Sequence, residues 1–189
     1  MRFAPLVLVT LLPASGFAAD RHPLYDAFLE FCAATGANAA AVKAAVEKNG
    51  GQSDREPGTT TYPWPMGARS WTVTVEGHTM SVIAGVGAPP AHGDDPAWLT
   101  SSCTVNSDTP DKASLAAIGA WAGVPANTTT SNRVATIYEC QQRGGRHVLL
   151  PRDLAGWRTA QSEDVWDLTL QHGNRFSGAF LMHASSPRH

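Results

Sequence analysis

Short turns join most of the strand-like segments of this sequence, and this feature restricts the fold more than any other. Three pairs of segments are rich in β-branched residues or alternate apolar with polar residues, and three or four residues containing glycine separate the members of each pair. The pairs are Trp71 to Val75 with Met80 to Val86, Val134 to Gln142 with His147 to Leu150, and Val165 to Gln171 with Arg175 to His183. Because strands joined by so few residues run antiparallel, the chain is predicted to contain an antiparallel sheet.

Three other segments have helical patterns. Pro23 to Thr35 carries an apolar stripe at helical spacing, and Asn38 to Lys48 is rich in alanine. Asp108 or Thr109, followed by Pro110, is typical of a helix start and predicts a third helix.

The order of these segments predicts an α+β fold. One more strand is expected at Trp98 to Val105, and the helices do not alternate strictly with strands, which disfavours a parallel sheet. We expect a twisted antiparallel sheet of about five to seven strands with two to three helices packed on one face. Gln52 to Ser70, which is polar and contains three prolines, is expected to be irregular.

The first eighteen residues have the composition of a secretory signal peptide. Arg2 precedes an apolar stretch from Ala4 to Leu12, and Gly16 and Ala18 provide small residues before a cleavage site. We therefore expect a signal peptide over residues 1–18 and a single soluble α+β domain over residues 19–189, located in the periplasm. Since no later apolar run approaches the roughly twenty residues of a membrane span, membrane insertion is not expected.

Three cysteines remain after this processing, so in an oxidising compartment two can pair and one is left over. Cys32 falls on the apolar face of the first predicted helix, and Cys103 falls in a strand that such a helix could cover. A bridge between Cys103 and Cys140 would join two strands, and such bridges are usually strained when the strands are directly paired. We favour a disulfide between Cys32 and Cys103, with Cys140 a buried free thiol.

Charge and motifs argue against several classes of function. Fourteen Lys and Arg against sixteen Asp and Glu leave no basic excess for binding nucleic acid. The chain has no G-x-S-x-G, S-x-x-K or catalytic cysteine motif, and Gly85-Val86-Gly87 lacks the rest of a phosphate-binding loop. We therefore predict no catalytic residue and no cofactor. Glu139 is the one carboxylate whose strand neighbours could shift its pKa, although strand alternation could equally point its side chain to solvent.

The tightest group of possible metal ligands is His92 with Asp94 and Asp95, which Gly93 would allow to face one cation. A solvated turn before Pro96 is the alternative interpretation, and we favour it because polar loops of this kind rarely bind a metal.

A rigid aromatic segment is the strongest indication of binding. Trp64 lies between Pro63 and Pro65, so it cannot join the centre of a sheet, and a stiff aromatic near an acidic loop suits recognition of a peptide or a sugar. The alternative is that the segment folds back and Trp64 covers the core. The candidate binding residues are Tyr62, Trp64, Met66, His92, Asp94, Asp95 and Trp98.

The motif Phe28-x-x-Phe31-Cys32-x-x-Thr35-Gly36, the alanine-rich helix, and Ser102-Cys103-Thr104-Val105 before a capped helix resemble small exported proteins of Gram-negative bacteria. The resemblance covers about the middle two-thirds of the chain. It implies a periplasmic location and a pair between Cys32 and Cys103, and it supplies no activity.

We expect a soluble periplasmic binding or interaction protein, such as an inhibitor or accessory factor of an envelope enzyme. It would use the loops from Tyr62 to Met66 and from Gly87 to Trp98 to bind an envelope protein or a small ligand. One alternative is a metal-assisted hydrolase of envelope material that uses His92, Asp94 and Asp95. Another is a subunit of an envelope assembly, which would show an exposed β-edge at Val165 to His183.

Overall fold

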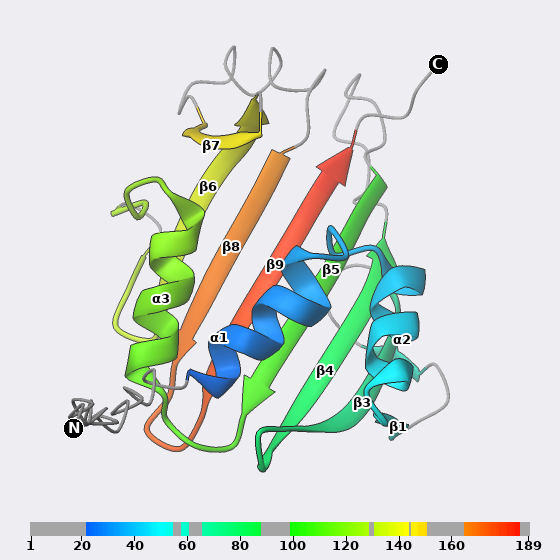
Figure 1. Cartoon of the computed structure of the whole chain (residues 1–189). Helices are drawn as coiled ribbons and strands as arrows, with labels where there is room; N and C mark the ends of the chain where they lie inside the picture. Colours follow the sequence, from blue (N-terminus) through cyan, green and yellow to red (C-terminus); the bar gives the residue numbers. More distant parts are fainter. Residues whose placement is uncertain are drawn as a thin grey trace, which may run out of the picture.

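One antiparallel sheet organises the described part of the chain, and its helices lie on one face of that sheet (Figure 1). The computed structural model describes residues 22–54, 58–60, 66–87, 99–128, 131–143, 145–150 and 165–185. The predicted α+β class is confirmed, with three helices over these residues. The expected strand number is wrong, because the sheet takes in nine described strands rather than five to seven.

The strands follow the order β1-β3-β4-β5-β9-β8-β6-β7, and β2 pairs with β3 as well. Their bounds are β1 (Gln52–Ser53), β2 (Gly58–Thr60), β3 (Met66–Val75), β4 (His78–Gly87), β5 (Leu99–Ser107), β6 (Ala135–Arg143), β7 (Arg146–Leu149), β8 (Val165–His172) and β9 (Ser177–Ser185). The two additional strands, β1 and β2, lie in the segment expected to be irregular, and both pair with β3. Strands of two and three residues are too short to show a period of two in the sequence.

All three predicted hairpins are present. Glu76 and Gly77 form the turn between β3 and β4, and both have positive φ, at 50° and 84°. Two central residues with positive φ are the mark of a type I′ turn, whose twist matches that of the paired strands.

The sheet is built from two antiparallel sets of strands that meet at its centre. β3, β4 and β5 form one set, β6, β8 and β9 form the other, and β5 pairs with β9 between them. Val165 to His183, where an exposed edge would have supported an assembly subunit, is not an edge of the sheet, because both β8 and β9 have neighbours on each side.

The first helix starts as α1 (Pro23–Ala27) and continues as the π-helical segment η1 (Phe28–Ala33). α2 (Ala39–Lys48) begins after Asn38, whose side chain accepts hydrogen bonds from the backbone N–H groups of Ala40 and Ala41.

The third helix, α3 (Lys112–Ala122), starts later than predicted. Its cap is Asp111, which accepts a 2.9 Å hydrogen bond from the Ser114 N–H and another from the Ser114 hydroxyl, rather than Asp108 or Thr109. At the other end Gly123 has a φ of 66°, a left-handed conformation that suits glycine at the end of a helix.

The core lies between the helices and the face of the sheet that they cover. Alternate residues of each strand point to that face, and apolar residues of the helices meet them. Its fully buried large side chains include Leu24, Phe28, Phe31, Val42, Val46, Trp71, Met80, Ile118, Leu168, Leu170 and Leu181.

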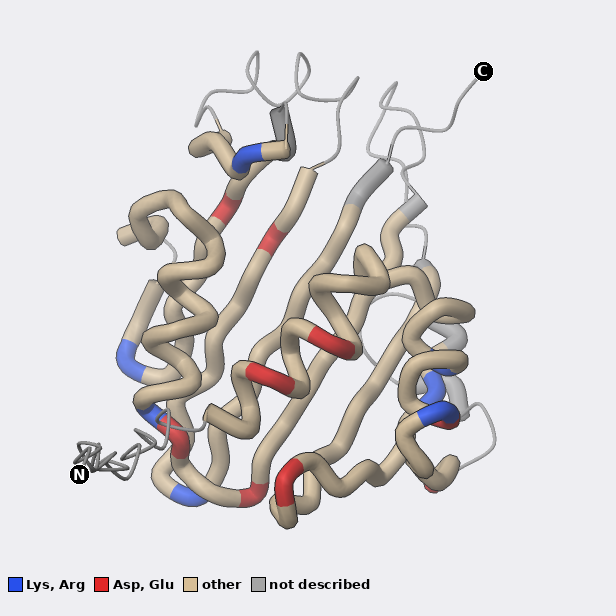
Figure 2. Tube along the Cα trace, in the orientation of Figure 1, with Lys and Arg blue, Asp and Glu red and all other residues tan. Residues whose placement is uncertain are grey.

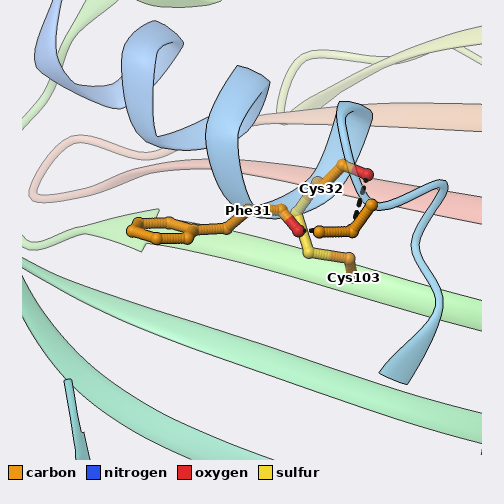
Figure 3. The surroundings of a disulfide bond; sticks show 4 residues. Phe31, Cys32 and Cys103 are labelled. Carbon is orange, nitrogen blue, oxygen red and sulfur yellow. Dashed lines mark hydrogen bonds between the residues drawn. A yellow bond between two sulfur atoms is a disulfide. The ribbon is translucent and has the colours of Figure 1, made fainter. Parts of the chain in front are cut away.

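A disulfide fastens the first helix to the sheet within this core. Figure 3 shows Cys32 of η1 joined to Cys103 of β5, the pair favoured from the sequence. The two Cα atoms are 5.3 Å apart, within the usual range for a disulfide, and both cysteines are fully buried. Cys140 is free and buried, on the same face of the sheet.

Candidate functional site

The face of the sheet opposite the helices, called the open face below, has a different composition from the core. In the part of the chain that the structure describes, no helix covers it (Figure 1). Four consecutive open-face positions of β5 are polar, and so are three of the four in β8. These positions are Thr100, Ser102, Thr104 and Asn106 in β5, and Val165, Asp167, Thr169 and Gln171 in β8.

Strand register aligns several of these polar residues into one row across the sheet. Gln171 of β8 is opposite Gly178 of β9, which is opposite Asn106 of β5. The row continues through Ser81 of β4 to Thr72 of β3. Residues directly opposite one another on one face have neighbouring side chains, so this row brings two amides and two hydroxyls together.

A pocket of about 410 Å³ lies along this row, at the end of the sheet where β8 turns into β9. This volume falls within the range of small-molecule sites in proteins. The pocket is lined by Thr72, Thr79, Met80, Ser81, Asn106, Ser107, Asp108, Gln171 and Phe176.

Gly178 makes room for the two amides of the row. A Cβ atom at this position would lie closer than 3.0 Å to the Asn106 side-chain oxygen and 3.5 Å from the Gln171 side-chain oxygen. The missing side chain therefore leaves the space in which the Asn106 amide lies, beside that of Gln171. Both amides border the pocket, where they can donate and accept hydrogen bonds.

Gly173 likewise leaves space for the ring of Phe176. A Cβ at Gly173 would lie closer than 3.0 Å to the ring of Phe176, so the ring rests on glycine backbone in the turn between β8 and β9. A hydrogen bond from the Gly173 N–H to the Phe176 carbonyl closes this turn at 3.0 Å. Phe176 is 43% exposed, so the ring is fixed by the turn yet presents apolar surface at the pocket.

The charges around the pocket are negative. Asp108 lines it, and the Thr72 hydroxyl donates its hydrogen to the Asp54 carboxylate, both of whose oxygens lie 2.8 Å away. None of the described residues that line the pocket is Lys or Arg. The pocket thus suits an uncharged ligand better than an anion.

A second polar feature of the open face is a pair of carboxylates. Glu139 of β6 lies directly opposite Asp167 of β8, and Figure 2 shows acidic positions side by side in these two strands. Asn127 donates a hydrogen bond to Glu139, and the Thr169 hydroxyl donates one of 3.1 Å to Asp167. Burial, together with the charge of Glu139, raises the pKa of Asp167 to about 6, although the Thr169 hydrogen bond lowers it.

Asp167, which was not predicted from the sequence, is the partner of Glu139, and burial raises the pKa of Asp167. Both carboxylates have hydrogen-bond partners within the chain. Asp167 therefore keeps its proton up to about pH 6 without a ligand.

The free thiol of Cys140 is unsuited to nucleophilic chemistry. Burial, and next the charge of Asp167, raise the pKa of Cys140 to about 11. Because the thiolate is the reactive form, a thiol with this pKa stays inert at neutral pH.

A smaller pocket of about 260 Å³ lies at the same end of the sheet, on the side of the helices. Pro23, His78 and Asp111 are among its lining residues. Asp111 already uses both side-chain oxygens to cap α3. This pocket is thus part of the junction between α1, α3 and the sheet.

Most of the candidate residues selected from the sequence lie outside the described residues. These are Tyr62, Trp64, His92, Asp94, Asp95 and Trp98. Met66 opens β3 and is opposite Thr60 of β2, at the edge of the sheet. The structure therefore neither groups these residues nor separates them.

Neither a metal centre nor a membrane helix is present in the described ranges. Within them, no three or more His, Cys, Asp or Glu side chains form a group that could hold a metal ion. The helices found there are too short or too polar to cross a bilayer.

The pocket residues Asn106, Gln171 and Phe176 were missed in the sequence. The alternation of polar residues in Thr100 to Asn106 does indicate a polar face of a strand. It does not reveal which residues of other strands lie beside Asn106, since that depends on register.

Comparison of the chain with protein-family models, with curated proteins and with solved structures found no match in any of the three searches.

Proposed function

We propose that this chain is an exported binding protein that holds a small polar ligand in the pocket of the open face. The observation that carries the proposal is the space left by Gly173 and Gly178. This space allows the ring of Phe176 and the amides of Asn106 and Gln171 to border the pocket. Apolar surface combined with a few placed hydrogen-bonding groups is the usual composition of a small-molecule site.

Export to the periplasm is the second part of the proposal. The signal-peptide pattern of residues 1–18 supports it, and the disulfide between Cys32 and Cys103 fits an oxidising compartment. In this proposal the ligand is bound without being transformed.

A binding role agrees better with these observations than the alternative of an assembly subunit does. The hydrolase alternative depends on His92, Asp94 and Asp95, which lie outside the described residues. The alternative of an assembly subunit depended on an exposed edge at Val165 to His183, and these strands lie inside the sheet.

The experiment is retention of components of an envelope extract by immobilised protein. We compare the wild type with Asn106→Ala/Phe176→Ala, which removes one amide and the ring from the pocket. Thr104→Ala is the matched control, because Thr104 lies on the open face of the same strand and does not line the pocket. We expect a component that the wild type and the control retain and the double variant releases. Equal retention by all three proteins, or retention by none, would contradict the proposal.

A further inference from the structure

The chemistry of the pocket also identifies the class of ligand, and this inference rests on the proposed function. The amides of Asn106 and Gln171 each offer donors and an acceptor, and Ser81 and Thr72 add hydroxyls in the same row. The ring of Phe176 presents a flat apolar surface beside them. A ligand that satisfies all of these groups has closely spaced hydroxyls and one apolar face.

Charge and the pairing of the strands argue against an anion and against a peptide that binds by adding a strand. Among the described residues that line the pocket none is cationic, whereas Asp108 lines it and Asp54 binds Thr72 beside it, so an anion would meet like charge. A peptide that binds by adding a strand needs free backbone groups at a sheet edge. The row crosses β4, β5 and β9, each of which is paired on both sides.

We propose that the ligand is a neutral saccharide. One sugar ring lies with its C–H face against Phe176, and neighbouring hydroxyls exchange hydrogen bonds with the amides of Asn106 and Gln171. Gly178 is a positioning residue, because a methyl group there would occupy the space of the Asn106 amide.

The test is titration by ligand-observed NMR with three uncharged trisaccharides: cellotriose, maltotriose and chitotriose. Trigalacturonic acid serves as the anionic probe, and N-acetylated, amidated tetra-alanine as the peptide probe. We expect at least one neutral trisaccharide to bind, and both other probes to bind at least tenfold more weakly.

Alanine variants of the residues that line the pocket test whether the trisaccharide binds there. Asn106→Ala, Gln171→Ala and Phe176→Ala should each weaken the affinity for that trisaccharide by about fivefold or more, the usual effect of one lost hydrogen bond or apolar contact. Asn174→Ala is the matched control, because Asn174 is an exposed amide of the same turn that does not line the pocket, and its affinity should equal that of the wild type.

Gly178→Ala tests whether Gly178 positions the Asn106 amide or is needed only for folding. The single variant should lose binding, and Gly178→Ala/Asn106→Ala should regain any lost melting temperature while remaining unable to bind. If Gly178→Ala fails to fold, the three alanine variants of the lining residues still decide the question.

The outcomes distinguish the ligand class from the function. If no trisaccharide binds, or the peptide binds in the pocket, while Asn106→Ala/Phe176→Ala still releases a component of the extract, the saccharide inference is wrong and the binding function stands. If a trisaccharide binds equally to all variants, the inference is wrong because the sugar lies elsewhere. If no trisaccharide binds and the double variant also releases no component that the wild type retains, the inference and the proposed function are both wrong.

Discussion

Asp167 is a carboxylic acid in a place where its charged form is costly. It is largely buried and directly opposite Glu139, so burial and the neighbouring charge raise its pKa from 3.8 to about 6. At neutral pH the folded protein must hold this carboxylate ionised beside another acid. Asp167 therefore lowers the stability of the fold when it is charged.

The first prediction follows from this residue. Between about pH 4 and pH 6 the unfolded chain has lost the Asp167 proton and the folded chain keeps it, so the free energy of unfolding falls as pH rises. Asp167→Asn removes this dependence and can keep the hydrogen bond from Thr169. We expect the variant to be more stable than the wild type at pH 7 by at most about 3 kcal/mol, and the difference to shrink towards pH 4.

Urea unfolding at several pH values between 4 and 8 measures this difference. Asp108→Asn is the control, because Asp108 is exposed and should give a much smaller change. An Asp167→Asn variant that is less stable than the wild type at pH 7 would contradict the prediction and show that the charge is needed for folding.

Among the elements, the first helix depends on its covalent bond to the sheet. The disulfide between η1 and β5 spans 71 residues of sequence and encloses α2, β3 and β4. A bond that closes a loop of this length restricts the unfolded chain much more than the folded one. The position of the helix over the core therefore owes part of its stability to the disulfide.

The second prediction concerns this bond. Cys32→Ala/Cys103→Ala should lower the free energy of unfolding by about 4 kcal/mol, the value of the chain-entropy model for such a loop. Cys140→Ala is the matched control, since it removes a buried cysteine without breaking a bond and should cost only about 1 kcal/mol.

Chemical denaturation with and without dithiothreitol gives the measurement. The reductant should destabilise the wild type and Cys140→Ala, and leave the double variant unchanged. Peptide mapping that joins Cys140 to Cys32 or Cys103 would show that the assignment is wrong.

For the whole molecule, the two faces of the sheet differ in what covers them. Three helices and the core occupy one face, and the row from Gln171 to Thr72 lies on the other. Polar groups on the open face can therefore change without opening a cavity in the core. Such a face is suited to carry a binding site.

The third prediction concerns the whole molecule in the cell. If residues 1–18 are a signal peptide, the protein from its native host should begin at Ala19 or Asp20. Mass spectrometry of the protein from a periplasmic fraction measures this N-terminus. An intact Met1 in a cytoplasmic fraction would remove the support for export.

Local patterns in the sequence predicted the elements well. The three hairpins were predicted because turn residues and alternation act over a few neighbours. The helix caps show the limit of that reasoning. Asp111, rather than Asp108 or Thr109, caps α3, because the choice among nearby polar residues depends on where the helix meets the sheet.

The sequence by itself determined the α+β class and the antiparallel pairs, because each of these follows from local periodicity. It favoured the pair Cys32–Cys103 over the other two possible pairs, and the structure confirms that choice. Only the tertiary structure decided which residues lie together in the pocket. Asn106 and Gln171 are 65 residues apart in sequence and lie on either side of Gly178, because β5 and β8 both pair with β9. That register is selected by burial of the opposite face, since a slip of one residue would turn the core side chains to solvent. The residues of the pocket are therefore brought together by packing of the core, which no pattern within a single strand records.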